Sequence, residues 1–341
     1  MTLGGTRSLR ARRAASSGGD AARRVLFAAA AASIIALTAC TASTGQSTQP
    51  SPSSTDAGPT ASPSGGAVGE QVEVAPGRYL WLDCQGEGSP TVILESGIHD
   101  SSEYWVNVQL LPPAAGPDVF TAVAEHTRVC RYDRPGTIIP GADLALTDRS
   151  TPVEGPRTIE GVATDLEAAL DAAGIEPPYL LAGHSFGGFL QTYYAQTHPD
   201  DVAGLVLIDA FSDRMQEFFG DKWAAYEPVL NGGPLQDETG WETFDVSASV
   251  MQSAAAEPLR SDLPMVVLSK TEPFPLPADV QGFTSADLES VWAQVQADLA
   301  TRVPGTPHMI AQGSDHYIQV REPDLVTSAI LLVLHRIAGE Q

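Results

Sequence analysis

The charge of this 341-residue chain limits its partners, because 42 Asp and Glu residues outweigh 19 Lys and Arg residues and give a formal charge of −23. Beyond residue 39 no cluster of Lys and Arg occurs, so nucleic acid and anionic membrane surfaces are poor partners. The three cysteines form no C-x-x-C motif, and H-E-x-x-H and G-x-x-x-x-G-K-[ST] do not occur. The sequence therefore predicts neither a metal site nor a nucleotide cofactor.

Residues 1–39 are predicted to be a lipoprotein signal peptide. Six arginines precede a short apolar stretch, residues 25–37, which is too short for a membrane-spanning helix and lacks a charged far flank. The stretch ends in Leu37-Thr38-Ala39-Cys40, which resembles the lipobox of bacterial lipoproteins. That resemblance implies cleavage before Cys40, lipidation of Cys40, and an exported protein anchored on the outer side of the cytoplasmic membrane. The alternative is an ordinary secretory signal with an incidental cysteine.

Residues 40–69 are predicted to be a disordered tether, because they are nearly all Ser, Thr, Pro, Gly, Ala and Gln and show no apolar periodicity. Residues 70–341 are long enough for one α/β domain with an insertion. Without residues 1–39 the formal charge is −28, which favours solubility outside the cytoplasm.

Strands alternate with helices along this domain, which predicts a mostly parallel sheet covered on both faces. A hairpin over residues 71–84 turns at Pro76-Gly77. Further strands are expected over residues 91–95, 128–132, 179–182, 203–208, 263–269 and 307–311, and helices over 103–110, 158–173, 189–195, 286–302 and 323–337.

Residues 211–262 interrupt this alternation. They are rich in Phe, Trp and Tyr, weakly periodic, and broken by Gly and Pro. Two interpretations stay open. The aromatic side chains cover an apolar pocket for an acyl or alcohol group, or they form only the core of the inserted segment itself.

The segment Gly183-His184-Ser185-Phe186-Gly187 carries the strongest functional signal. An apolar strand precedes it and a helix follows it, and G-x-S-x-G in that context is typical of a nucleophile elbow. A serine on such a turn is held in a strained conformation, with its hydroxyl at the positive end of a helix.

Residues from about 78 to 337 resemble the α/β-hydrolase fold family. The matching segments, in the family's order and spacing, are residues 90–97, 128–136, 183–188, 204–210 and 313–316. The resemblance implies a mostly parallel eight-stranded sheet flanked by helices, with a cap inserted after the sixth strand at about residues 211–262. It also implies a serine, an acid and a histidine in that chain order.

The family's pattern gives each site residue an expected role. Ser185 would be the nucleophile and His316, between the last strand and the last helix, the base. Asp209 is the preferred acid, but many family members place the acid where this chain has Glu272, so both stay open. The backbone N–H groups of Ile98 and Phe186 would form the oxyanion hole. These two residues follow Gly97 and the nucleophile in the sequence.

Cys84 and Cys130 fall on what the family would make neighbouring strands, so a disulfide and two free buried thiols are both open. The expected activity is hydrolysis of a small carboxylic ester through an acyl-Ser185 intermediate. An amidase, a thioesterase or a carbon–carbon bond hydrolase could use the same residues. An inactive hydrolase-fold binding lipoprotein is the alternative from another class. The sequence is silent on substrate identity and oligomeric state.

Overall fold

The computed structural model describes residues 69–106, 116–141, 144–276 and 282–339. The expected signal peptide, the lipidation site at Cys40 and all but the last residue of the expected tether lie outside these residues. Among the residues described, no helix is both long enough and apolar enough to cross a membrane.

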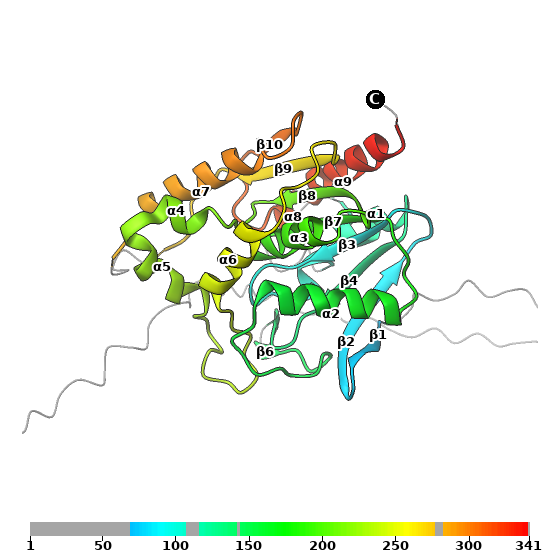
Figure 1. Ribbon diagram of the computed structural model, residues 1–341, viewed down its shortest axis with the longest axis horizontal. Helices are drawn as coiled ribbons and strands as arrows, with labels where there is room; N and C mark the ends of the chain where they lie inside the picture. Colours follow the sequence, from blue (N-terminus) through cyan, green and yellow to red (C-terminus); the bar gives the residue numbers. More distant parts are fainter. Residues whose placement is uncertain (1–68, 107–115, 142–143, 277–281, 340–341) are drawn as a thin grey trace, which may run out of the picture. The chain divides into compact units, whose positions relative to one another are not determined.

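The described chain is built around an eight-stranded sheet (Figure 1) with the strand order β1-β2-β4-β3-β7-β8-β9-β10. The pairs β1–β2 and β2–β4 are antiparallel and every other pair is parallel, which confirms the predicted mostly parallel sheet. The strands are β1 (Glu70–Ala75), β2 (Arg78–Gln85), β3 (Thr91–Glu95), β4 (Val129–Asp133), β7 (Tyr179–His184), β8 (Val202–Ile208), β9 (Met265–Lys270) and β10 (His308–Ala311).

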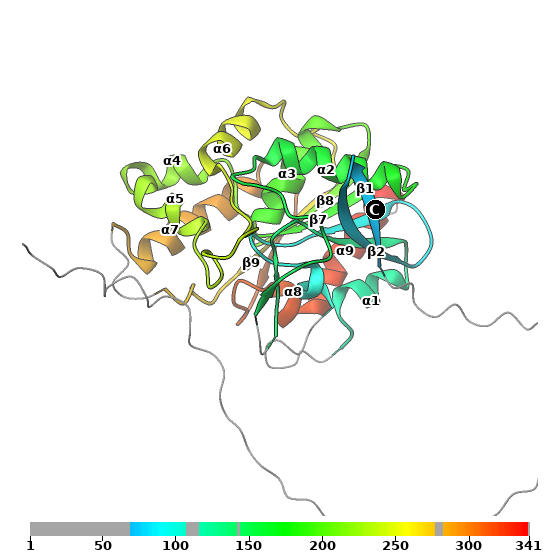
Figure 2. The same ribbon diagram turned by 90° about the horizontal axis from the view of Figure 1, so that it is seen from below.

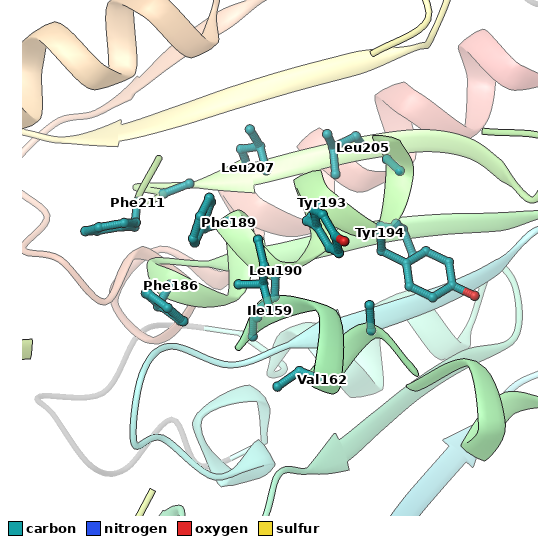
Figure 3. Close-up of a cluster of buried hydrophobic side chains, with 14 of the residues drawn as sticks. Ile159, Val162, Phe186, Phe189, Leu190, Tyr193, Tyr194, Leu205, Leu207 and Phe211 are labelled. Atoms are coloured by element: carbon teal, nitrogen blue, oxygen red, sulfur yellow. The ribbon is translucent and has the colours of Figure 1, made fainter. Parts of the chain in front are cut away.

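Helices cover both faces of the sheet (Figure 2). Helices α2 (Ile159–Ala172) and α3 (Phe186–Thr197) lie on one face, and α1 (Val119–Ala124) and α9 (Pro323–Ile337) lie on the other. Successive strand residues alternate between these faces. Leu205 and Leu207 belong to the core that α2 and α3 cover, and Figure 3 shows them on the side of α3, whereas Val206 and Ile208 belong to the core under α1 and α9.

The helices begin where the sequence supplies capping side chains. The Thr158 side chain accepts a hydrogen bond from the Gly161 N–H at the start of α2. Helix α7 (Ser285–Leu299) begins with a capping box, in which Thr284 and Asp287 satisfy each other's backbone N–H groups. Both helices were predicted, and their ends differ from the expected ones by three residues or fewer, which is the usual uncertainty of helix boundaries.

Short elements were harder to predict. Over the expected helix 103–110, the structure has only a 3₁₀ turn, η1 (Ser102–Trp105), before residues outside the described part. The pair β5 (Ile138–Ile139) and β6 (Ala145–Leu146), helix α1 and helix α8 (Ile318–Arg321) were not predicted. Such elements are too short for an apolar period to show in the sequence.

Between β8 and β9 the chain forms four short helical elements, and two of them, α4 (Met215–Phe219) and α5 (Trp223–Leu230), lie beside α7 in both views (Figures 1 and 2). We call residues 211–262 the cap segment. Its elements are α4 (Met215–Phe219), η3 (Gly220–Lys222), α5 (Trp223–Leu230) and α6 (Val246–Ala255). It contributes Phe211, Phe219, Trp223 and Phe244 to the same apolar core as α2 and α3.

A disulfide joins β2 to β4. Cys84 and Cys130 are direct partners in the antiparallel register, with Cα atoms 4.1 Å apart and sulfur atoms bonded at 2.07 Å. Of the two states that the sequence left open, the structure has the bonded one.

Candidate active site

Ser185 lies on the sharp turn between β7 and α3, with φ 54° and ψ −124°. The turn is possible because the surrounding glycines let helix and strands approach closely. A Cβ atom on Gly183 would lie 2.6 Å from the Cα of Gly188, and one on Gly187 would lie 2.3 Å from the Ser96 carbonyl oxygen. Real Cβ atoms essentially never lie so close to other atoms. Any other residue at Gly183 or Gly187 would therefore push helix and strands apart.

Three non-glycine residues of the described chain have a positive φ, and all three lie at this end of the sheet. They are His99 (64°), Ser185 (54°) and Asp209 (43°), which follow strands β3, β7 and β8. A side chain in this region of φ is strained, and such strain persists only where surrounding structure imposes it. Its concentration here marks the carboxyl ends of the parallel strands as the candidate active site.

His316 and Asp209 are in direct contact. The imidazole Nδ1 lies 2.6 Å from Asp209 Oδ2, although 107 residues separate them in the chain. The Asp209 side chain is completely buried, and its other oxygen accepts a hydrogen bond from the Lys270 N–H at 3.2 Å. Because a carboxylate only accepts hydrogen bonds, the ring proton is on Nδ1, and Nε2 is left free to accept a proton. Glu272, the other candidate acid, has an exposed side chain.

Backbone contacts bring Ser185 beside this pair. The Ser185 N–H donates to the Ile208 carbonyl, 3.0 Å away and one residue before Asp209. The residue before Ser185 is bound as well: the side-chain Nε2 of His184 lies 2.9 Å from the His316 carbonyl oxygen and donates to it. Burial and the neighbouring His316 hold the pKa of His184 well below its ordinary value, so His184 is neutral. Within the described residues the Ser185 hydroxyl has no hydrogen-bond partner, and serine–histidine bonds are often long in free enzymes.

The two expected oxyanion donors flank the serine. The Phe186 N–H is the first of α3, where helical N–H groups lack partners within the helix, and Ile98 lies on the loop after β3. Neither N–H donates to an acceptor among the described residues. Two unpartnered N–H groups near a strained serine can stabilise a negative charge that develops on a substrate oxygen.

Three buried ionisable residues near the site were not assigned a role from the sequence. Arg134 and Glu242 form an ion pair with an Nε–Oε1 distance of 2.7 Å. Asp100 follows His99, and burial raises the pKa of its carboxyl group to about 8. Arg134 lies within a segment that the family resemblance had marked, residues 128–136, whereas nothing in the irregular sequence around Glu242 distinguishes it.

No group of three or more His, Cys, Asp or Glu side chains in the described ranges is arranged to hold a metal ion.

Comparison with known proteins identifies the family. The sequence pattern of the α/β-hydrolase fold matches residues 90–318, which is more than half of the chain. The chain belongs to the α/β-hydrolase fold family. The lipase LipV of Mycobacterium tuberculosis is 37% identical to this chain over 109 residues, which are 30% of this chain and 41% of LipV. The uncharacterized protein YqjL of Bacillus subtilis is 23% identical over 246 residues, which are 72% of this chain and 84% of YqjL.

A solved structure of similar fold is that of the epoxide hydrolase CorEH, with a TM-score of 0.51 and 17% identity over 79% of this chain and 99% of that one. At this identity the likeness concerns the fold alone. The chain spans 16% to 42% of the length of three further curated relatives. Membership of this α/β-hydrolase family, with a lipase among the relatives, supports a hydrolase function.

Proposed function

We propose that this α/β-hydrolase is an exported serine hydrolase that cleaves small carboxylic esters through an acyl-Ser185 intermediate. The observation that carries the proposal is the 2.6 Å contact between His316 Nδ1 and the buried Asp209 carboxylate, beside a serine held at positive φ. An isolated serine hydroxyl is a weak nucleophile, and a histidine that is oriented and charge-stabilised by a carboxylate is the usual means of activating it.

In the proposed reaction, Ser185 Oγ attacks the ester carbonyl carbon while His316 Nε2 takes the hydroxyl proton. Asp209 stabilises the imidazolium that forms, and the Ile98 and Phe186 N–H groups bind the oxyanion. Collapse of the tetrahedral intermediate expels the alcohol, which receives the proton from His316. A water molecule, deprotonated by His316, then attacks the acyl-enzyme and releases the carboxylic acid.

The location is proposed on sequence grounds. Residues 1–39 would be removed, Cys40 would carry the lipid, and residues 40–69 would tether the domain 70–341 to the outer side of the cytoplasmic membrane. More than one acyl chain on Cys40 gives stable anchoring, whereas a single chain gives only marginal binding. Mass spectrometry of membrane-extracted protein should find a lipid-modified N-terminal cysteine. A Cys40→Ser variant that stays equally lipidated and membrane-bound would contradict this part of the proposal.

The activity is tested with the full-length protein in mild detergent and a fluorophosphonate probe, which reacts with activated serines. We expect labelling of the wild type, no labelling of Ser185→Ala, and a loss of ester turnover of about 10⁶-fold in that variant. A panel of p-nitrophenyl esters of increasing acyl length then defines the pocket. A folded wild type that neither reacts nor hydrolyses would favour the inactive binding lipoprotein. If the enzyme instead preferred an amide, a thioester or a carbon–carbon bond, the proposed substrate class would be wrong, but the proposed roles of Ser185, His316 and Asp209 would stand.

A further inference from the structure

The loop that carries the Ile98 N–H is held by one buried guanidinium group. Arg134 Nη1 donates to the Ser96 carbonyl at 2.9 Å, and Nη2 donates to the Gly97 carbonyl at 2.6 Å. The Arg134 side chain is only 2% exposed. A guanidinium is a rigid planar fork of donors, so its orientation fixes both carbonyls at once.

The bond to Gly97 has a consequence for Ile98. The Gly97 carbonyl and the Ile98 N–H belong to one planar peptide unit, and in a trans peptide they point in opposite directions. This peptide is trans. The Gly97 oxygen also accepts from the Asp100 N–H at 3.1 Å. Fixing that oxygen on one side of the loop therefore aims the Ile98 N–H to the other side.

Glu242 of the cap segment holds this arrangement from outside the loop. Its carboxylate accepts from Arg134 Nε at 2.7 Å and from Arg134 Nη2 at 3.0 Å, and Oε2 also accepts from the His99 N–H at 2.8 Å. The residues on both sides of Ile98 are thus bound, Gly97 through Arg134 and His99 by Glu242 itself. The Glu242 side chain is completely buried, and hydrogen bonds to a charged group are the strong ones.

The His99 ring strengthens the same contact between loop and cap segment. It stacks on Trp241 with ring centroids 4.1 Å apart, and its Nε2 lies 2.8 Å from the Leu230 carbonyl oxygen. Burial lowers the pKa of His99 below its ordinary value, so the ring is neutral and leaves Arg134 as the positive partner of Glu242. His99 itself has φ 64°, a backbone conformation that its surroundings must maintain.

We propose that Glu242 is a positioning residue which, through Arg134 and His99, sets the direction of the Ile98 N–H. The oxyanion site is then complete only when the cap segment is docked on the loop after β3. This inference rests on the proposed esterase function and adds to it a dependence of catalysis on a residue outside the sheet.

The first test is Glu242→Gln in the full-length protein, with kcat and KM measured on a p-nitrophenyl ester. We expect kcat to fall about 100-fold, because misplacement of a catalytic group by about 1 Å has an effect of that size, with KM changed little. The matched control is Asp83→Asn. Asp83 is the buried acidic partner of Arg131, with an Nε–Oδ2 distance of 3.0 Å, and among the described residues its side chain hydrogen-bonds neither to residues 96–101 nor to the cap segment. Its kcat should equal that of the wild type.

A second readout separates positioning from general damage. A trifluoromethyl ketone, whose hemiketal carries an oxyanion, should bind Glu242→Gln about 100-fold more weakly than wild type, while the carboxylic acid product binds equally well. If Glu242→Gln fails to fold by circular dichroism, Arg134→Lys takes its place, because an ammonium group keeps the charge but cannot reach both carbonyls as a fork does.

Unchanged kcat and ketone affinity in a folded variant at either position would overturn the inference and leave the esterase proposal standing. Equal losses in the Asp83→Asn control would overturn it as well, because the effect would then be general. A wild type without esterase activity would overturn the proposed function and this inference together.

Discussion

The two halves of the candidate site are held in different ways. At the sheet, backbone hydrogen bonds between neighbouring strands fix Ser185 and Asp209, for example from the Ser185 N–H to the Ile208 carbonyl and from the Asp209 N–H to the Leu268 carbonyl. The loop with Ile98 has a backbone bond at its far end, from the Ile138 N–H to the His99 carbonyl, but the two residues that flank Ile98 are also held by side chains, those of Arg134 and Glu242. The acid–base half, together with the Phe186 N–H that follows Ser185, is therefore as rigid as the sheet, whereas the direction of the Ile98 N–H depends on the docking of the cap segment.

The largest effect is expected at the acid of the rigid half. In Asp209→Asn the amide can no longer hold the His316 Nδ1–H tautomer or stabilise the imidazolium, so kcat should fall about 10⁴-fold. In Glu272→Gln, which changes an exposed side chain, kcat should be unchanged. Steady-state kinetics of the two variants on one ester measure both. A large loss in Glu272→Gln and a small one in Asp209→Asn would reverse the assignment.

The rigid half is also the part that the sequence could predict. The family resemblance gave Ser185 and Asp209 their expected roles, and the sheet explains why they are neighbours, because the carboxyl ends of parallel strands meet at one edge. The choice between Asp209 and Glu272 was not decided by the sequence, because each follows a strand that ends at that edge. Only the three-dimensional course of the loop carrying His316 distinguishes them, and it brings His316 to Asp209.

The oxyanion half could be predicted only in part. Ile98 and Phe186 follow from their places beside Gly97 and Ser185, because backbone donors do not depend on side-chain identity. Glu242 could not be found, since it lies in an irregular stretch 108 residues after its partner Arg134. Contacts of this kind arise from tertiary packing, for which a single sequence carries no periodic signal.

Asp100 offers a pH test of the same loop. Burial, with a further contribution from the nearby Glu242 charge, raises the pKa of its carboxyl group from 3.8 to about 8. The folded state thus keeps a proton that the unfolded chain releases above pH 3.8, so stability is lost as pH rises toward 8. Each pH unit in this range costs about 1.4 kcal/mol, or about 4 kcal/mol from pH 5 to pH 8.

Asp100→Asn cannot ionise and should lack this loss. Urea unfolding at pH 5 and pH 8 measures the free energy of unfolding of both proteins. Between these two pH values, the free energy of unfolding of the variant should rise relative to that of the wild type by up to about 4 kcal/mol. Parallel pH profiles for the two proteins would mean that Asp100 is ionised in the fold, and that the loop after β3 is better hydrated than its burial indicates.

The disulfide tests whether the outer strands of the sheet influence the site. Replacing both Cys84 and Cys130 with alanine removes a link across 46 residues and should lower the free energy of unfolding by 2 to 4 kcal/mol, as is typical of such links. Because Cys130 lies near the amino end of β4, whereas Arg134 and the site lie at its carboxyl end, kcat should stay the same at temperatures where the variant is folded. A changed kcat would show that the outer strands influence the site.

The aromatic side chains of the cap segment fall into two groups, which bears on the two interpretations left open by the sequence. Phe244 lies against Phe186, next to the proposed nucleophile, with ring centroids 4.6 Å apart. Phe219 instead stacks on Tyr226 at 4.3 Å and meets Phe283 edge-on at 5.9 Å. The first group lies beside the site, whereas the rings of the second pack on one another and on Phe283, which lies outside the cap segment.

Phe219→Ala measures what the second group does. Truncation of this buried ring should lower the free energy of unfolding by about 3 kcal/mol, because the contacts with Tyr226 and Phe283 are lost and a cavity remains. If the group is only the core of the cap segment, preference among p-nitrophenyl esters of different acyl length should not change, whereas Phe244→Ala should shift it. A shift of equal size in Phe219→Ala would place this group in the substrate pocket, and the cap segment would then determine both which acyl chain binds and how the oxyanion is stabilised.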